Sequence, residues 1–270
     1  MPETYTLTGV GTGDHIDLIL PNVRLRSVEG LGMPDVKHFT EDYAQQEGEA
    51  YLGSRLKPRH LMFNFQLVYD TEADLWTARD DLIRVVSVLE DGVYLTVTMP
   101  NGDEREIVVR YSGGLSLPRS LEHNLSQQVC VLECIAHDPL FYDPMPVTYP
   151  YINTDVGVNQ NINNAGSWIT YPQFHIVGPL SAPKVVHGSQ ILDLSAYNIA
   201  GAEWINIDLR PGHKTIISSV AGNILPYLTE ASDLATFCFE PGGSTFRVEG
   251  GGTSGATTFA VAFYALYVGV

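Results

Sequence analysis

Apolar and polar residues alternate along much of the chain, and this alternation predicts strands. It is clearest over residues 61–69, where Phe63, Phe65 and Leu67 share one face, and it recurs over 16–20. A further short strand is expected at 23–25, after a Pro-Asn turn, and an apolar strand at 128–136. A period of two is that of a strand with one face in the core. The pattern therefore favours a mainly β protein.

One stretch has the helical period instead, because its apolar residues recur every three or four positions. Asp70 or Thr71 can cap this helix, and Glu72 and Asp74 fall in its first turn, where the helix dipole favours anions. Gly92 ends it. We expect one α-helix over about 71–91, with an apolar face made of Leu75, Ala78, Leu82, Val85, Val86 and Leu89.

Two segments on either side of this helix have different patterns. Residues 93–98 and 105–111 are predicted to form a hairpin whose Asn101-Gly102 turn supplies positive φ angles. Residues 30–60 hold several glycines and prolines among scattered apolar residues, and we expect a long excursion with at most short strands there. A loop of that length in a compact domain is usually functional or ordered by a partner.

A change in composition near residue 145, toward Asn, Tyr and Gly, predicts two domains, at 1–144 and 145–270. Beyond the boundary, short strand signals recur without helical segments between them, which is typical of a β-sandwich. The strands expected in this second domain are 171–177, 191–194, 204–209, 215–220, 235–239, 245–248 and 258–268.

The chain is acidic, with a net charge of −16, and most of the imbalance lies in residues 1–143, which carry −12. Proteins bind nucleic acids and anionic membranes through clustered Lys and Arg. The chain has no such cluster, and its four lysines are scattered. We therefore expect neither specific nucleic-acid binding nor attachment to an anionic membrane.

The cysteines, the first residues and the longest apolar run each bear on where the protein folds and whether it enters a membrane. Cys130 and Cys134 share a strand face but lie ~13 Å apart, too far for a disulfide, so free buried thiols and folding in a reducing compartment are expected. The first residues lack the basic and apolar regions of a signal peptide. The longest apolar run, 256–270, is shorter than the ~20 residues that span a bilayer, so no membrane insertion is expected.

A search for catalytic and metal-binding motifs finds none of the usual patterns. The sequence has no G-x-S-x-G, P-loop, H-E-x-x-H or C-x-x-C. The adjacent carboxylates at 41–42 and 80–81 are expected on solvated surfaces. Oxygens suited to calcium occur at Asn153, Asp155, Asn159 and Asn163, without the glycine and terminal glutamate of an EF-hand loop. We expect no enzyme, no catalytic residue, no cofactor and no metal.

Three aromatic residues of the second domain are of interest because exposed rings on a β-sandwich can stack on sugars. Trp168 follows a turn, and Tyr171 begins an expected strand, so both are candidate sugar-stacking residues. Trp204 heads an alternating strand, and we expect it in the core.

The order of several short strings resembles the distal tail protein family of long-tailed, siphovirus-type bacteriophages. The resemblance covers nearly the whole chain, and it is the spacing of the strings together that is specific. The strings are Gly30-Leu31-Gly32-Met33-Pro34, residues 46–53, Pro58-Arg59-His60, residues 136–143, Asn164-Ala165-Gly166, Tyr171-Pro172, Gly178-Pro179 and Glu240-Pro241-Gly242-Gly243.

This resemblance implies a barrel-like first domain with one helix and a galectin-like or carbohydrate-module-like second domain. In that family the first domain forms a six-fold ring in the virion, which joins the tail tube to the tip or baseplate and lets DNA pass. The implied partners are further copies of the chain, the tail tube protein, the tail hub or fibre-bearing protein and the tape measure protein. Receptor-binding proteins are candidate partners of the second domain. The family has no catalytic residues.

A cyclic ring needs a heterologous interface, in which one patch meets a different patch on the next copy. The segment 30–60 offers apolar candidates for it: Met33, Phe39, Tyr43, Tyr51 and Leu52. The acidic first domain would suit a channel that repels phosphate, so that passing DNA does not stick.

Two other functions remain open from the sequence. The first is a carbohydrate-binding adhesin, with Trp168 or Tyr171 exposed at the host surface. The second is a glycoside hydrolase, which needs two carboxylates ~5–10 Å apart; the sequence nominates no such pair.

Overall fold

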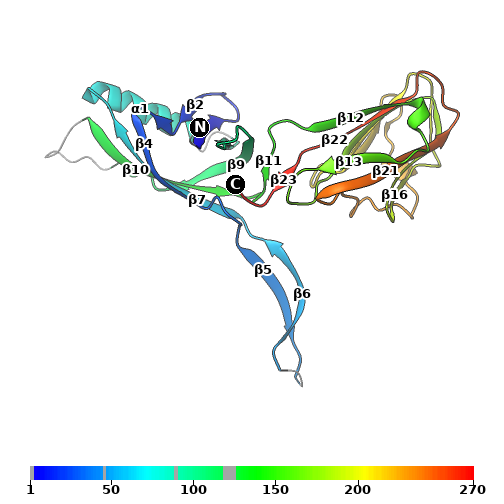
Figure 1. Ribbon diagram of the computed structural model, residues 1–270, viewed down its shortest axis with the longest axis horizontal. Helices are drawn as coiled ribbons and strands as arrows, with labels where there is room; N and C mark the ends of the chain where they lie inside the picture. Colours follow the sequence, from blue (N-terminus) through cyan, green and yellow to red (C-terminus); the bar gives the residue numbers. More distant parts are fainter. Residues whose placement is uncertain (1–2, 45–46, 88–90, 118–125) are drawn as a thin grey trace. The chain divides into compact units, whose positions relative to one another are not determined.

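The computed structural model describes residues 3–44, 47–87, 91–117 and 126–270. The chain is mainly β, with a single α-helix in the described part, which confirms the expected fold class (Figure 1). It divides into two compact units. The first holds Met1–Pro144 and Tyr267–Val270, and the second holds Met145–Leu266. The last four residues, which we expected in the second domain, thus belong to the first unit.

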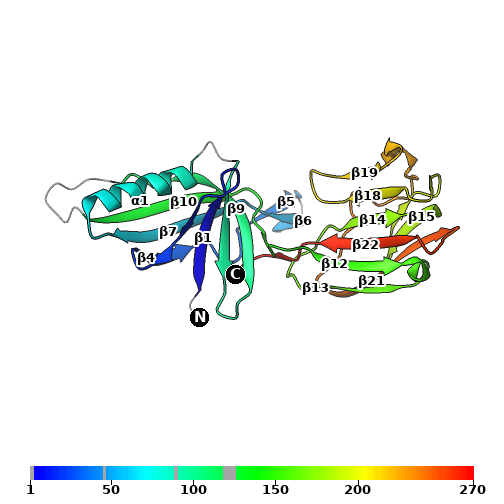
Figure 2. The same ribbon diagram turned by 90° about the horizontal axis from the view of Figure 1, so that it is seen from above.

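One antiparallel sheet, with the strand order β2-β1-β8-β9-β10-β7-β4-β3, forms the body of the first unit (Figure 2). β11 and β23 pair beside this path. The strands expected at 23–25, 61–69 and 128–136 are present, whereas β1 was not expected. The single strand expected at 16–20 is divided at Leu18 into β2 and β3, which lie at opposite ends of the sheet. The bounds are β1 (Thr4–Gly9), β2 (His15–Asp17), β3 (Ile19–Leu20), β4 (Val23–Glu29), β7 (Arg59–Val68), β8 (Val93–Thr98), β9 (Glu104–Gly113), β10 (Gln127–Ala136), β11 (Phe141–Tyr142) and β23 (Leu266–Tyr267).

The two ends of this sheet are joined by the chain itself. The end strands β2 and β3 are consecutive in sequence, with Leu18 between them. Leu18 is fully buried, and its N–H donates to the Tyr5 carbonyl at 2.8 Å. Alternate residues of β7, β8 and β10 fill the interior with Phe63, Phe65, Leu95, Val97 and Leu132. The unit is barrel-like, as expected.

The helix α1 (Glu72–Val85) packs its buried residues Leu75, Leu82 and Val85 into this core. Thr71 is the N-cap, and its Oγ1 accepts from the Asp74 N–H at 3.2 Å. The predicted helix was too long, because Val86 already has non-helical angles (φ −94°, ψ 13°). The β-branched run that starts at Val85 disfavours further helix. Leu89 lies outside the described residues.

The hairpin of β8 and β9 is present, with Val93 opposite Val109. Its turn differs in detail from the prediction. Gly102 has φ +91°, but Asn101 is not in the left-handed region. The Asn101 side chain instead accepts from the Asp103 N–H at 3.1 Å. The asparagine thus stabilises the turn by a side-chain hydrogen bond, which is a common use of Asn in turns.

Two sheets form the second unit, with an aromatic core between them that includes Phe174, Phe246 and Phe259. The six-stranded sheet holds β12 (Val147–Ile152), β22 (Thr258–Phe263), β14 (Gln173–Val177), β18 (Trp204–Asp208), β19 (Thr215–Ser218) and β20 (Gly222–Asn223). The five-stranded sheet holds β13 (Gln160–Asn164), β21 (Gly242–Gly251), β15 (Leu180–His187), β16 (Gln190–Asp193) and β17 (Asn198–Ile199). Short 3-10 helices lie at Asn153–Asp155 and Leu225–Tyr227.

The strand expected at 235–239 is wrong. Phe237 and Phe239 are buried alternately, as in a strand, but within the described residues this stretch forms no ladder, and its backbone pairing is a bridge between Phe239 and Thr170.

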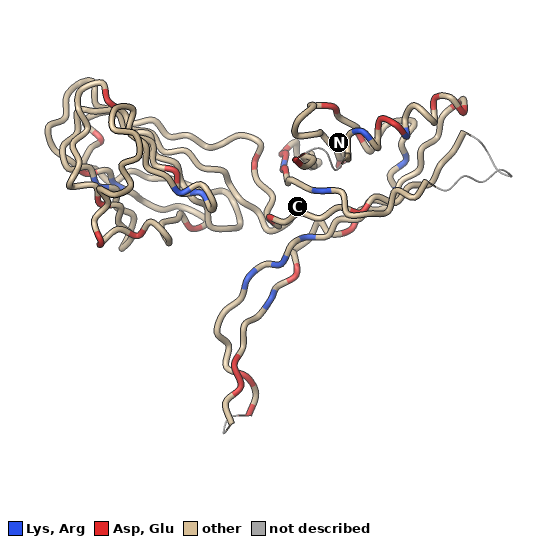
Figure 3. The backbone as a smooth tube through the Cα atoms, turned by 180° about the vertical axis from the view of Figure 1, so that it is seen from behind, with Lys and Arg blue, Asp and Glu red and all other residues tan. Residues whose placement is uncertain are grey.

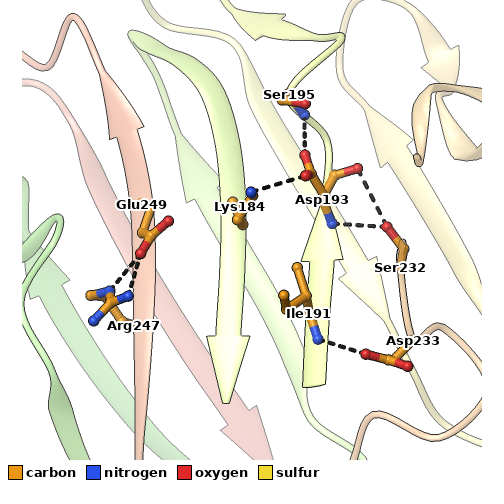
Figure 4. Close-up of polar contacts among 8 residues, drawn as sticks. All are labelled: Lys184, Ile191, Asp193, Ser195, Ser232, Asp233, Arg247 and Glu249. Carbon is orange, nitrogen blue, oxygen red and sulfur yellow. Dashed lines mark hydrogen bonds and ion pairs between the residues drawn. The ribbon is translucent and has the colours of Figure 1, made fainter. Parts of the chain in front are cut away.

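The preceding residues 229–233 cover the edge of β16 (Figure 4). Asp233 accepts from the Ile191 N–H and Ser232 Oγ from the Asp193 N–H, both at 2.9 Å. Covered edges do not template further strand pairing.

All three cysteines are free thiols. Cys130 and Cys134 are buried on one face of β10, as predicted, and Cys238 is partly exposed. Burial raises the pKa of Cys130 to about 11 and that of Cys134 to about 12. At neutral pH both are therefore almost entirely protonated, and the thiolate is the reactive form.

We predict that a thiol reagent labels Cys238 first in the folded protein at pH 8. At that pH, about one in a thousand Cys130 side chains is a thiolate, and fewer of Cys134. Mass spectrometry of the labelled chain would show one fast site, with all three sites labelled rapidly after denaturation. Rapid labelling of Cys130 or Cys134 in the folded chain would contradict this packing.

Candidate assembly surface: the β5–β6 hairpin

The segment 30–60 is a long hairpin, so our expectation of at most short strands was wrong. β5 (Val36–Asp42) and β6 (Glu49–Leu56) form a two-stranded sheet of their own, which leaves the rest of the first unit at β7 (Figure 1). Within the described residues, neither strand pairs with another. An isolated two-stranded hairpin is at best marginally stable in water. This hairpin therefore lacks the support that other strands of the unit have.

The apolar side chains along the hairpin and its approach are exposed. The exposed fractions run from 39% for Phe39 to 68% for Met33. The five candidate interface residues all fall in this exposed set: Met33, Phe39, Tyr43, Tyr51 and Leu52. Their contact with a neighbouring copy stays a prediction. Large apolar side chains gathered on one exposed element mark an interaction site.

A β-bulge in the middle of the hairpin places two of these residues together. Thr40 pairs with Tyr51 and Phe39 with Gly53, so that Leu52 is the extra residue of β6. A bulge bends the strand and increases its twist. Tyr51 and Leu52 are both more than 60% exposed. The bulge thus presents two consecutive large side chains to solvent.

The charged residues of the two strands are unevenly placed, with cations near the root of the hairpin and carboxylates near its tip, and Asp35 lies at the root just before β5 (Figure 3). Lys37 lies opposite Arg55, and Asp42 lies opposite Glu49. Like charges directly across a ladder are destabilising. Both cations lie over the Phe39 ring, at 5.2 and 5.6 Å from its centroid, which offsets part of their repulsion. Within the hairpin, each of these two cross-strand pairs therefore joins side chains of the same charge.

A buried arginine fixes the root of the hairpin. Arg59, the first residue of β7, is 2% exposed, and its guanidinium lies 4.8 Å from the centre of the Phe141 ring. Its guanidinium nitrogens donate four hydrogen bonds, each to a backbone carbonyl. Nη1 donates to Gly30 at 2.6 Å and to Gly32, Nε to Pro139 at 2.9 Å, and Nη2 to Val268 at 2.7 Å.

This clamp joins three stretches of chain that are far apart in sequence: the entry to the hairpin, the stretch before β11, and the C-terminal residues. Burial lowers the pKa of Arg59 to about 10, so it stays cationic at neutral pH. Gly30 has φ +91°, and a Cβ there would lie 2.0 Å from the His60 carbonyl oxygen. A glycine is therefore required at this point for the chain to pass close to β7.

Trp168 and Tyr171, the two candidate sugar-stacking residues, are both partly buried. Tyr171 packs against the core of the second unit, and Lys214 Nζ lies 5.7 Å from its ring centre. The Trp168 N–H donates to the Leu266 carbonyl at 3.0 Å. The prediction for Trp204 was wrong, because this residue is partly exposed on the outer face of its sheet and does not belong to the core.

Within the described residues, no three His, Cys, Asp or Glu side chains are grouped so as to hold a metal ion. Two of the calcium candidates are engaged elsewhere: Asp155 accepts from the Ile152 N–H at 2.8 Å, and Asn159 from Arg247 at 3.2 Å. Asp81 forms an ion pair with Arg84 at 3.1 Å on the helix surface. No helix of the described chain has the length and apolar character needed to cross a membrane.

Comparison with solved structures matches nearly the whole chain. The crystal structure of the Dit protein (gp 19.1) of phage SPP1 superimposes with a TM-score of 0.71 at 18% sequence identity, over 97% of this chain and 98% of that one. The chain has the fold of SPP1 Dit. A chain of the phage p2 baseplate, in its activated conformation with Sr, matches with a TM-score of 0.53 at 8% identity over the same shares.

The Dit fold is thus established from structure, while sequence relationships are weaker. The minor tail protein Gp27 of Mycobacterium phage D29 is 27% identical over 135 residues. That match covers 47% of this chain and 39% of the phage D29 protein, so it spans well under half of that protein's length. No family model matches the chain.

We predict that Arg59→Met destabilises the first unit by about 3 kcal/mol or more. The apolar side chain would leave buried carbonyls without a donor, and hydrogen bonds to a charged group are worth about 1.5–3 kcal/mol each. Urea denaturation followed by circular dichroism measures the loss. Arg26→Met, which removes an exposed arginine that donates to Gln66 on the same sheet, is the control and should cost under about 1 kcal/mol. Equal costs for the two variants would refute the clamp.

Proposed function

We propose that this chain is a structural protein of a phage tail tip, and that it assembles into a ring through its β5–β6 hairpin. The observation that carries the proposal is the hairpin itself, a two-stranded element on a Dit fold without further strand partners in the described chain. It carries four large exposed apolar side chains, and a fifth, Met33, lies just before it. Such an element gains stability when a second protein covers it. In a ring, that protein is the next copy.

A ring is the assembly that a single projecting hairpin favours, because the hairpin is one surface and its partner on the next copy is another. A hairpin that reaches from one copy onto a different surface of the next forms a heterologous contact, and repeated contacts of this kind close into a cyclic oligomer. The number of copies that we propose is six, by the resemblance to the distal tail family. The Dit fold and the tail protein match of phage D29 support a place in the virion tail.

In this proposal the partners are the tail tube protein, the tail hub or fibre-bearing protein, the tape measure protein and, on the second unit, receptor-binding proteins. The ring would join the tube to the tip and let DNA pass. Residues 1–143 carry a net charge of −12, and an acidic channel repels phosphate. The protein acts by assembly and has no enzymatic step.

We predict that the double variant Tyr51→Ser, Leu52→Ser weakens association at least a hundredfold. Burial of each of these side chains contributes about 1.5–3 kcal/mol, and every 1.4 kcal/mol is a factor of ten in affinity. Light scattering should give about six times the mass of one chain for the unchanged protein, with annular particles in negative stain, and a much smaller mass for the variant.

Val220→Ser is the matched control, because Val220 is 78% exposed and lies on the second unit. It should assemble like the unchanged chain. Both variants should keep the melting temperature of the monomer, since the altered side chains are exposed. A double variant that assembles as well as the unchanged chain would show that the hairpin is not the interface.

A further inference from the structure

The outer face of the six-stranded sheet in the second unit carries an aromatic and polar patch of unassigned role. Adjacent strands β14 and β18 turn Phe174, Ile176, Ile205 and Ile207 into the core. The alternate residues of these strands face the other way. They are Gln173, His175, Val177, Trp204, Asn206 and Asp208.

A histidine and an asparagine form a fixed pair at the centre of this face. His175 lies opposite Asn206, both side chains are exposed, and His175 Nδ1 is 2.6 Å from Asn206 Oδ1. If Nδ1 donates, Nε2 is left as an acceptor and the Asn206 amide as a donor. If the amide donates instead, the roles are exchanged. In both cases the pair presents one donor and one acceptor to solvent.

The ring of Trp204 lies beside this pair. The centres of the Trp204 and His175 rings are 5.8 Å apart, and the two planes are tilted by 36°. Trp204 is partly exposed. On the other side of His175, the partner on β22 is Ala260, whose methyl group is too short to cover the imidazole. An aromatic surface and a donor–acceptor pair are thus adjacent and open.

The charges next to this patch neutralise one another. Arg210 Nη2 lies 2.7 Å from Asp208 Oδ2, and Gln173 Nε2 donates to the same oxygen at 2.9 Å. These contacts hold the pKa of Asp208 below its usual value, although burial alone would raise it. Asp208 therefore stays ionised and paired with Arg210, so it leaves no unpaired carboxylate beside the patch. A neutral, polar ligand fits such a surface better than an anion or a cation.

We propose that Trp204, His175 and Asn206 form a binding subsite for a neutral pyranose sugar. A pyranose has an apolar C–H face, which packs on an aromatic ring. Its neighbouring hydroxyls each donate and accept, and so match the two free groups of the His175–Asn206 pair. The subsite does not depend on ring assembly, and it does not use Trp168 or Tyr171.

The test is a titration of the full chain with D-galactose, D-glucose, D-mannose and N-acetyl-D-glucosamine, followed by the indole N–H signals in nitrogen-15 NMR spectra. The chain has three tryptophans, and Trp204→Phe assigns the signal of Trp204 by its loss. Weak binding is expected for a single sugar ring, so the titration extends to about 100 mM. At least one of these sugars should shift the Trp204 signal in a saturable way, while the signals of Trp76 and Trp168 stay in place.

Asn206→Ala and His175→Ala should each weaken the sugar affinity about tenfold, as expected for the loss of one hydrogen bond. Asn161→Ala, which changes an exposed asparagine on β13 of the other sheet, should bind like the unchanged chain. The Trp76 and Trp168 signals report that each variant is folded. The proposal is overturned if no sugar shifts the Trp204 signal, or if Asn206→Ala and His175→Ala bind the sugar as tightly as the unchanged chain does.

Discussion

The first unit is organised around a desolvated cation, Arg59, that is held by backbone carbonyls instead of by a carboxylate. A buried charge is tolerated when its donors are paired, and here the acceptors come from three separate stretches of chain. Because a guanidinium is planar and directs its donors at fixed angles, it sets the relative positions of the stretches that it joins. The root of the β5–β6 hairpin is thereby rigid, although the hairpin beyond it has no support from other strands.

This contrast between the fixed root and the unsupported strands of the β5–β6 hairpin links the fold to the proposed function. A hairpin with a rigid root loses less conformational entropy when it binds, because its direction is set beforehand. Its exposed apolar residues and its like-charge pairs cost stability in the isolated chain. A neighbouring copy that covers the hairpin would offset these costs, because it would bury the apolar side chains and could pair the charges. The patch around Trp204 differs from it, since its charges are already neutralised within the unit.

Sequence patterns predicted the elements that bury one clear face, among them β7, α1 and the β8–β9 hairpin. They missed strands whose burial does not alternate cleanly: β13 is polar at the sheet edge, and β15 contains Pro183 next to Ala182 at φ +54°. The β5–β6 hairpin was missed for a related reason, because a strand exposed on both faces has no period. Its apolar residues could be named as interface candidates. The Arg59 clamp could not be predicted from the sequence. Its acceptors are backbone carbonyls, and no pattern of side chains reveals which carbonyls lie near one another.

Hydrogen–deuterium exchange of the hairpin amides, compared between monomer and assembled oligomer, tests the central claim most directly. In the monomer, amides of β5 and β6 should exchange much faster than those of β7, since the hairpin lacks tertiary support. On assembly, the account predicts that exchange slows markedly along β5 and β6. Hairpin amides that exchange equally fast in the oligomer and the monomer would contradict it.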